Sequence, residues 1–219
     1  MSNKKPSLLD TRWFWPLAGL LIGLAAVLVM ALVILPALAP HAFAGTLLQS
    51  PEPAYDFSLQ GPQGGVRLSQ FRGKVVLLFF GYGQCPDVCP ATLVTMSHVI
   101  NRLGERAGQV QAVWVSVDPE RDTPASMQRL LSHYNPAILG ITSVPPDLEL
   151  METIAGAYGV FFQKRDVDRP CDEGPGMCYL VDHTATTMLI DPQGYLRVVY
   201  PFGTTADEIS ADVEYILTH

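Results

Sequence analysis

Charge is missing from a long stretch near the start of this 219-residue chain, which has no Asp, Glu, Lys or Arg between Trp13 and Pro51. Charged residues make up only 16% of the whole chain, well below the roughly 25% of ordinary soluble domains. Residues 13–36 are apolar or small without interruption, and at about 1.5 Å per residue they exceed a hydrocarbon core of about 30 Å. We therefore predict one transmembrane helix over residues 13–36 rather than a purely soluble protein.

Basic residues are scarce too, and their positions set the expected orientation of that helix. Lys4, Lys5 and Arg12 precede it, and no lysine or arginine follows it until Arg67. The positive-inside rule then places residues 1–12 in the cytoplasm and the rest of the chain across the membrane. No long presequence rich in Arg and Ser precedes the helix. The expected location is therefore a bacterial inner membrane, crossed once, with the domain in the periplasm.

A cleaved signal peptide is the alternative, because residues 42–44 read Ala-Phe-Ala and offer an A-x-A cleavage site. The apolar core of a signal peptide is normally about 7–15 residues long, shorter than this segment, so we favour an uncleaved anchor. Cleavage after Ala44 stays open. Residues 37–54 then form a proline-rich tether, and residues 55–219 form the exported domain.

The exported part of the chain also lacks a basic surface. Beyond residue 50 there are 11 basic and 20 acidic residues, a net charge of −9. Nucleic-acid binding depends on a basic footprint that contacts phosphate. We therefore expect no nucleic-acid partner.

The pattern of apolar residues in the exported part predicts alternating strands and helices. Residues 74–81 and 110–117 are continuous apolar runs typical of strands buried on both faces. Segments with a helical period of apolar residues lie before or after these runs. A short hairpin that ends at Leu68 comes first. The pattern predicts an α/β sandwich with a mixed central sheet and an N-terminal β-hairpin. Helices are expected over residues 86–103, 123–134, 147–158 and 206–217, and shorter strands over residues 159–163, 187–190 and 196–200.

Cysteines are few, four in all, and the first two carry the strongest local signal. Cys85 and Cys89 lie in GYGQCPDVCP, where a buried strand gives way to a helix. Residues i and i+4 of a helix have Cβ atoms about 5–6 Å apart, which is long for a disulfide and suitable for two thiolates on one metal. A helix N-terminus lowers thiol pKa values. The pair suits a soft ion such as Cu(I); it can equally close to a disulfide, or be structural.

A third ligand for such a site would come from a histidine. His183 precedes a predicted core strand, at the loop that faces the helix-start cysteines in thioredoxin-like folds. That loop usually carries a cis-proline, but no proline occurs here between Pro175 and Pro192, so an imidazole can take its place. The other histidines fall in the tether, at the last position or inside predicted helices: His41, His219, His98 and His133.

Taken together, the motifs resemble those of the Sco/SenC family. The chain reads GYGQCPDVCP, then SVDPERDTP at residues 116–124, then VDHT at residues 181–184 and LIDPQG at residues 189–194. Members of that family are membrane-anchored, thioredoxin-like copper proteins that serve cytochrome c oxidase assembly. The resemblance covers about residues 53–217 and implies that Cys85, Cys89 and His183 bind copper, as Cu(I) or Cu(II).

The resemblance implies a metallochaperone that delivers copper to the dinuclear copper site of cytochrome c oxidase subunit II; the copper donor stays open. The alternative is a thiol–disulfide oxidoreductase in which Cys85 and Cys89 keep the acceptor's metal-binding cysteines reduced. Whether the protein is an enzyme therefore stays open. A peroxidase is disfavoured, since Tyr82 stands where peroxiredoxins have threonine, and a structural zinc site would lack one ligand.

Three acidic residues lie beside these motifs. Asp87, between the cysteines, is expected either to support the ligands from behind or simply to favour the helix dipole. Asp118 and Asp122 are expected to shape a strand end and to cap the next helix. The chain departs from the family at Gly83 and Gln84, where members often have Thr-His; this removes an imidazole but no ligand.

A second departure is the segment RPCDEGPGMC at residues 169–178, which reads as an insertion before the VDHT motif. In an oxidising compartment Cys171 and Cys178 are expected to form a local disulfide. The alternative is that this pair exchanges with Cys85 and Cys89, because four cysteines allow three pairings. Met177 is a further soft donor, although a loop methionine is more often no ligand.

Overall fold

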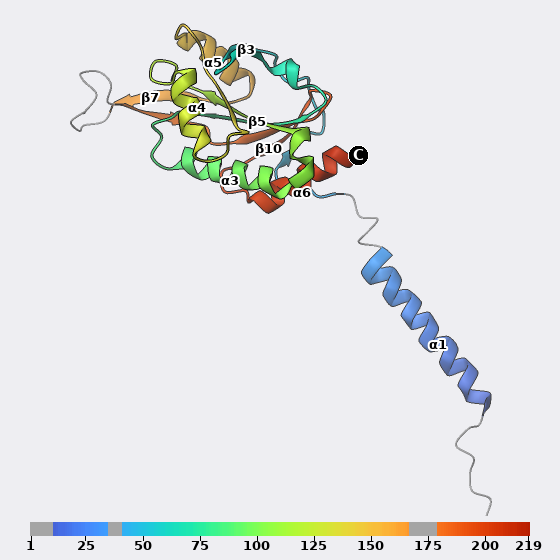
Figure 1. The fold of residues 1–219 in the computed structure, drawn as a ribbon. Helices are drawn as coiled ribbons and strands as arrows, with labels where there is room; N and C mark the ends of the chain where they lie inside the picture. The colour runs from blue at the N-terminus through green and yellow to red at the C-terminus, as the bar shows by residue number, and fades with distance from the viewer. Residues whose placement is uncertain (1–10, 35–40, 167–178) are drawn as a thin grey trace, which may run out of the picture. The chain divides into compact units, whose positions relative to one another are not determined.

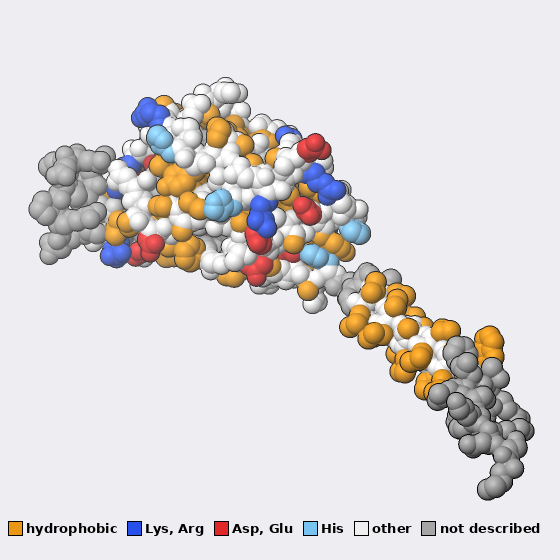
Figure 2. Space-filling view, turned by 60° about the horizontal axis from the view of Figure 1, so that its bottom comes forward, with side chains coloured by type: hydrophobic (Ala, Val, Ile, Leu, Met, Phe, Trp, Pro, Cys, Tyr) orange, Lys and Arg blue, Asp and Glu red, His pale blue; other side chains and the backbone are white. Residues whose placement is uncertain are grey.

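The charge-free stretch forms a helix, α1 (Thr11–Val29), which continues as the π-helical segment η1 (Met30–Ile34). The computed structural model describes residues 11–34, 41–166 and 179–219, with the backbone alone at residues 11–14. Its segment Trp15–Ile34 is long and apolar enough to cross a membrane, and no residue of it is buried. Figure 2 shows this helix covered with hydrophobic side chains. The finding is consistent with the predicted anchor; an N-terminal signal sequence would have the same properties.

The rest of the chain, Phe43–His219, is a second compact unit built on a six-stranded mixed sheet. Its strand order is β1-β10-β9-β4-β5-β6, with β4, β5 and β6 parallel and the other pairs antiparallel. The two strands predicted from continuous apolar runs are its centre, and every residue of β4 is buried. The strands are β1 (Thr46–Leu47), β4 (Val75–Gly81), β5 (Val110–Ser116), β6 (Leu139–Ile141), β9 (Thr187–Ile190) and β10 (Leu196–Tyr200).

Helices cover both faces of this sheet, which confirms the predicted α/β sandwich (Figure 1). One face carries α3 (Val88–Arg102) and α6 (Ala206–Thr218), which pack against each other. The opposite face carries α4 (Pro124–Ser132) and α5 (Leu148–Ala157). The described residues also form two short 3-10 helices, η2 (Leu68–Phe71) and η3 (Gly104–Gln109).

The domain begins earlier than the sequence suggested. Residues 37–54 were expected to be a tether, yet β1 lies within them and pairs with β10. The Ala44 backbone N–H also donates to the buried Asp212 carboxylate at 3.0 Å. An open edge of β10 would expose unpaired backbone groups, and β1 covers it. The compact unit therefore starts at Phe43 rather than at residue 55.

Within the described parts of the chain, two antiparallel pairs lie outside the central sheet. The first, β2 (Ser58–Gly61) with β3 (Gly64–Arg67), is the predicted hairpin. The second, β7 (Phe162–Asp166) with β8 (Tyr179–His183), was not predicted as a pair. Only part of β7 was expected as a strand, and β8 was expected as a loop. The structure instead places His183 at the end of β8, opposite Phe162.

Candidate metal centre

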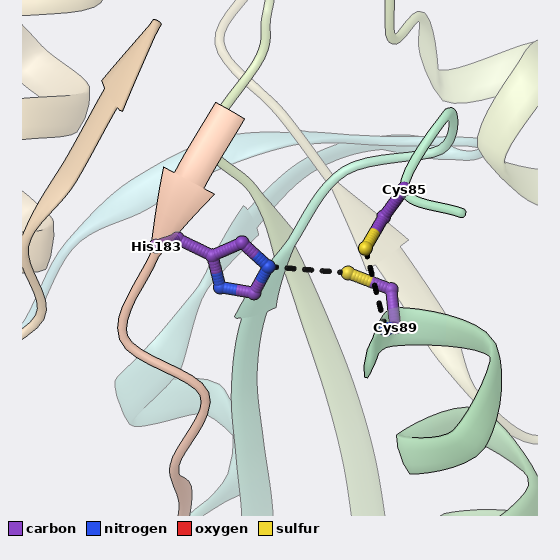
Figure 3. Close-up of side chains that lie close together, drawn as sticks. All are labelled: Cys85, Cys89 and His183. Atoms are coloured by element: carbon purple, nitrogen blue, oxygen red, sulfur yellow. Dashed lines mark hydrogen bonds between the residues drawn. The ribbon is translucent and has the colours of Figure 1, made fainter. Parts of the chain in front are cut away.

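Three side chains from separate segments meet beyond the end of β4 (Figure 3). Cys85 comes from the loop after β4, Cys89 from the first turn of α3, and His183 from the end of β8. One donor atom of each lies within 4.8 Å of the others. The Cys89 Sγ is 3.4 Å from the His183 Nε2. The three residues that the motifs singled out are therefore brought together by the fold.

The close approach of α3 to the strand end requires glycine at the last position of β4. A Cβ atom at Gly81 would lie 2.9 Å from the Cys89 Sγ, 2.9 Å from the Trp114 ring and 2.8 Å from the Phe79 ring. Real Cβ atoms do not approach other atoms this closely. Any side chain at Gly81 would therefore displace Cys89 or the aromatic core beneath it.

The start of α3 holds the Cys85 sulfur by its backbone. The Cys89 N–H donates to the Cys85 Sγ at 3.4 Å, and the Asp87 N–H also points at this sulfur. The pKa of the Cys85 thiol is lowered to about 3. The largest cause is the hydrogen bond with the Cys89 thiol; His183 and the two backbone N–H groups act in the same direction, while burial opposes them. Cys85 is thus a half-buried thiolate.

Cys89 is the opposite kind of thiol. It is 1% exposed, and its pKa is raised, first by the hydrogen bond to the Cys85 sulfur and then by burial. The Tyr82 backbone N–H acts against this shift. Without a metal, the pair therefore holds one thiolate and one thiol, with the thiolate on the accessible side.

His183 is oriented for binding through Nε2. Its Nδ1 lies 3.1 Å from the Thr184 carbonyl oxygen, which can only accept, so Nδ1 carries a proton. In the neutral imidazole the free lone pair is then on Nε2, which faces Cys89. The Phe79 and Tyr82 rings pack edge-on against the imidazole, with centroids at 6.0 and 5.9 Å. These contacts restrict the rotation of the ring.

The segment after β5 supports the cysteine loop from behind. The Asp122 carboxylate accepts from the Gly83 N–H at 2.9 Å and from the Ser116 hydroxyl at 2.5 Å. Burial raises its pKa. The expectation that the acids here cap the next helix is wrong, because Thr123 caps α4 by accepting from the Ser126 N–H. Asp122 instead shapes the loop that carries Cys85.

The other predicted residues lie either at exposed positions of the described structure or outside the described residues. Asp87 is exposed at the N-cap of α3, its carboxylate makes no capping hydrogen bond, and its supporting role stays a prediction. His98 and His133 are exposed on the surface. The expectations for the insertion concern residues outside those that the structure describes: Cys171, Cys178 and Met177.

Sequence reasoning missed Arg121 and Tyr179. The Arg121 side chain is 3% exposed and forms an ion pair with Asp118, and the Tyr179 hydroxyl donates to the same carboxylate at 2.7 Å. The one available signal was a basic residue within the acidic motif at residues 116–124. No spacing rule links that motif to the start of β8.

Two sulfurs and one imidazole nitrogen form a soft donor set that fits copper, whereas a structural zinc site would need a fourth ligand. A thioredoxin-like fold with a half-buried thiolate, a buried thiol and a facing histidine defines the class: a thiol-based metal-binding or redox protein.

The comparisons identify the family. The SCO1/SenC family model matches residues 47–218, so the chain belongs to the SCO1/SenC family, which confirms the resemblance seen in the motifs. The chain is 35% identical over 161 residues to the protein SCO2 homolog, mitochondrial, of Bos taurus, covering 72% of this chain and 57% of that one. It spans about half the length of the curated relatives it matches, between 43% and 57% for the first three.

Solved structures agree with this membership. The apo Sco1 protein of Thermus thermophilus is 44% identical, with a TM-score of 0.69, covering 82% of this chain and 99% of that one. ScoI of Bradyrhizobium japonicum, solved with copper bound, is 34% identical, with a TM-score of 0.66, covering 76% and 100%. The thioredoxin-like fold expected from the resemblance is therefore confirmed.

Proposed function

We propose that this protein is a copper metallochaperone that serves the assembly of cytochrome c oxidase. The observation that carries the proposal is the meeting of Cys85, Cys89 and His183 within 4.8 Å, in a fold shared with a Sco protein solved with copper bound. Copper is the cargo of such a protein. Its acceptor, by this proposal, is the dinuclear copper site of oxidase subunit II.

The site can hold copper in two ways. Cu(I) needs only the two sulfurs, and Cys85 already offers a thiolate while Cys89 loses its proton on binding. Cu(II) gains from the imidazole of His183 as a third ligand. Because Cys85 is the accessible sulfur, an acceptor thiolate can approach copper from that side and replace the ligands one at a time.

The test is an anaerobic titration of the reduced protein with Cu(I) and with Cu(II), using His183→Ala and the matched control His98→Ala. His98 lies exposed on α3. We expect one tightly bound equivalent of copper in the wild type. The sulfur-to-Cu(II) charge-transfer band should be lost in His183→Ala and kept in His98→Ala. Weak copper binding that neither substitution changes would overturn the proposal.

A second candidate function is thiol–disulfide exchange, favoured by the contrast between an accessible thiolate at Cys85 and a buried thiol at Cys89. Cys85 would attack an acceptor disulfide, forming a mixed disulfide and releasing one acceptor thiolate. Cys89, losing its proton, would then attack Cys85, releasing the second acceptor thiolate. The acceptor gains two electrons, and the Cys85–Cys89 pair is oxidised to a disulfide.

The two functions can be separated by trapping. A Cys89→Ser variant that accumulates a mixed disulfide through Cys85, with reductase activity surviving His183→Ala, would favour the oxidoreductase. If no such adduct forms, the oxidoreductase function is contradicted and the copper-chaperone function remains.

We further propose that α1 anchors the domain in a bacterial inner membrane, with residues 1–12 in the cytoplasm and the domain in the periplasm. The apolar segment Trp15–Ile34 and the three cations before it support this. A reporter enzyme that works only in the periplasm should be active when it is fused after His219. Activity of a cytoplasm-specific reporter at that position would overturn the topology.

A further inference from the structure

One buried cation contacts both parts of the metal centre, namely the segment that carries Cys85 and Cys89 and the strand β8 that carries His183. Arg121 follows β5, and its side chain is 3% exposed and paired with the buried Asp118. A single ion pair uses only part of its guanidinium. Its other contacts reach both the segment that carries Cys85 and the strand that carries His183.

On the cysteine side, Arg121 is bonded to the residue just before Cys85. The Arg121 Nη1 donates to the Gln84 Oε1 at 2.9 Å. The guanidinium carbon also lies 5.7 Å from the centroid of the Tyr82 ring, and that ring packs edge-on against His183. The departure from the family at Gln84 therefore places an acceptor where Arg121 can hold the loop.

On the histidine side, Arg121 fixes the start of β8. The same Nη1 donates to the Tyr179 carbonyl at 2.9 Å, and the guanidinium carbon lies 3.7 Å from the centroid of the Tyr179 ring. The Lys164 ammonium also lies over that ring, 4.7 Å from its centroid. Tyr179 begins the five-residue strand that ends at His183.

These contacts matter because, among the described residues, β8 has no ladder with the central sheet and pairs with β7 alone. Its His183 end continues through residues 184–186 into β9, whereas its Tyr179 end is held to the rest of the domain by side chains, those of Arg121 and Asp118 among them. Arg121 is bonded both to that end of β8 and to the loop of Cys85, which follows β4 directly.

We propose that Arg121 is a positioning residue that holds His183 in register with Cys85 and Cys89 and so determines how well the site binds Cu(II) relative to Cu(I). The inference rests on the proposed copper-binding function. The two sulfurs that suffice for Cu(I) are held by the start of α3, independently of β8. The third ligand for Cu(II) depends on the position of β8, and hence on Arg121.

The experiment compares Arg121→Lys with the matched control Arg165→Lys in the full chain in detergent. Lysine keeps a cation beside Asp118, but its single ammonium cannot span Gln84 and Tyr179 together. Arg165 lies on β7 and forms an exposed ion pair with Asp182. The control therefore makes the same exchange at an exposed position of the β7–β8 pair.

We expect Arg121→Lys to lower Cu(II) affinity by about 10–100-fold, the usual effect of losing a residue that supports a metal ligand. Cu(I) affinity should stay within about twofold of wild type, and the Cu(II) charge-transfer band should shift or weaken. In the metal-free protein, the imidazole NMR signal of His183 should move or broaden. Arg165→Lys should change none of these.

Three results would overturn the inference: an unchanged ratio of Cu(II) to Cu(I) affinity in folded Arg121→Lys, a parallel loss of both affinities, or an equal change in Arg165→Lys. If Arg121→Lys does not fold, Gln84→Leu removes one arm of the contact alone, and the same ratio is measured. A wild-type protein that binds neither ion overturns the proposed function itself, and this is seen before any variant is compared.

Discussion

The unequal thiols at the metal centre make a prediction about reactivity that can be checked without copper. An ordinary thiol with a pKa of about 8.5 is only about 0.3% thiolate at pH 6, and its alkylation rate rises about tenfold per pH unit below that pKa. Cys85, with a pKa lowered to about 3, is essentially all thiolate there. Its alkylation rate should therefore be nearly flat between about pH 5 and pH 8, where an ordinary thiol gains several hundredfold.

The absolute rate is not the diagnostic quantity. Nucleophilicity falls with pKa with a Brønsted coefficient of about 0.4–0.5, so a pKa about 5.5 units lower costs roughly 150–550-fold per thiolate. This loss nearly cancels the gain in thiolate fraction at pH 6. The shape of the pH profile, rather than the speed at one pH, separates the two cases.

The assay uses the reduced, metal-free unit of residues 43–219, treated with iodoacetamide at several pH values and analysed by site-resolved mass spectrometry. Cys85 should be alkylated before Cys89 and with a flat profile; Cys89, buried and with a raised pKa, should be slow throughout. A Cys85 rate that climbs tenfold per pH unit through pH 7, or earlier alkylation of Cys89, would refute the assignment of the thiolate.

Three further outcomes follow from the packing around the site. Gly81→Ala places a methyl group 2.9 Å from the Cys89 Sγ and should lower the free energy of unfolding by about 1–3 kcal/mol, measured by urea denaturation. Asp122→Ala removes the acceptor of two hydrogen bonds and should cost about 2–3 kcal/mol; the exposed Asp207→Ala should change little, and equal losses would contradict the argument. The reduced domain should lose stability as pH falls from about 8 to 4, because the folded state binds fewer protons than the unfolded state while Cys85 has the lowered pKa. Cys85→Ser should abolish that part of the slope in thermal melts.

Local sequence patterns predicted most of the central sheet and the location of the cysteines. The strand that ends at Gly81, the helix of Cys89 and the start of α4 all follow from residues a few positions apart, where apolar runs, helical periods and capping residues act directly. The position of His183 opposite the cysteines came from a resemblance, since no local rule joins segments 94 positions apart.

The parts that sequence reasoning missed depend on contacts between distant residues. Strand β7 ends in a charged run with no alternation of apolar and polar residues. Its pairing with β8 therefore could not be predicted from the sequence pattern. In the sequence, Arg121 is one more charged residue in an acidic motif, and nothing in the pattern assigns it a role. Its role comes from three partners supplied by separate segments: Asp118, Gln84 and Tyr179.

The close packing at Gly81 also gives the domain an optical reporter. Of the three tryptophans in the chain, Trp13 and Trp15 lie in the apolar N-terminal segment, so a fragment that begins at Phe43 keeps only Trp114. Its indole and the Cys89 sulfur both lie 2.9 Å from the Cβ position that Gly81 leaves empty. Tryptophan fluorescence of the fragment therefore comes from a single indole beside the buried sulfur, and its intensity should follow copper loading and disulfide formation in real time without any added dye.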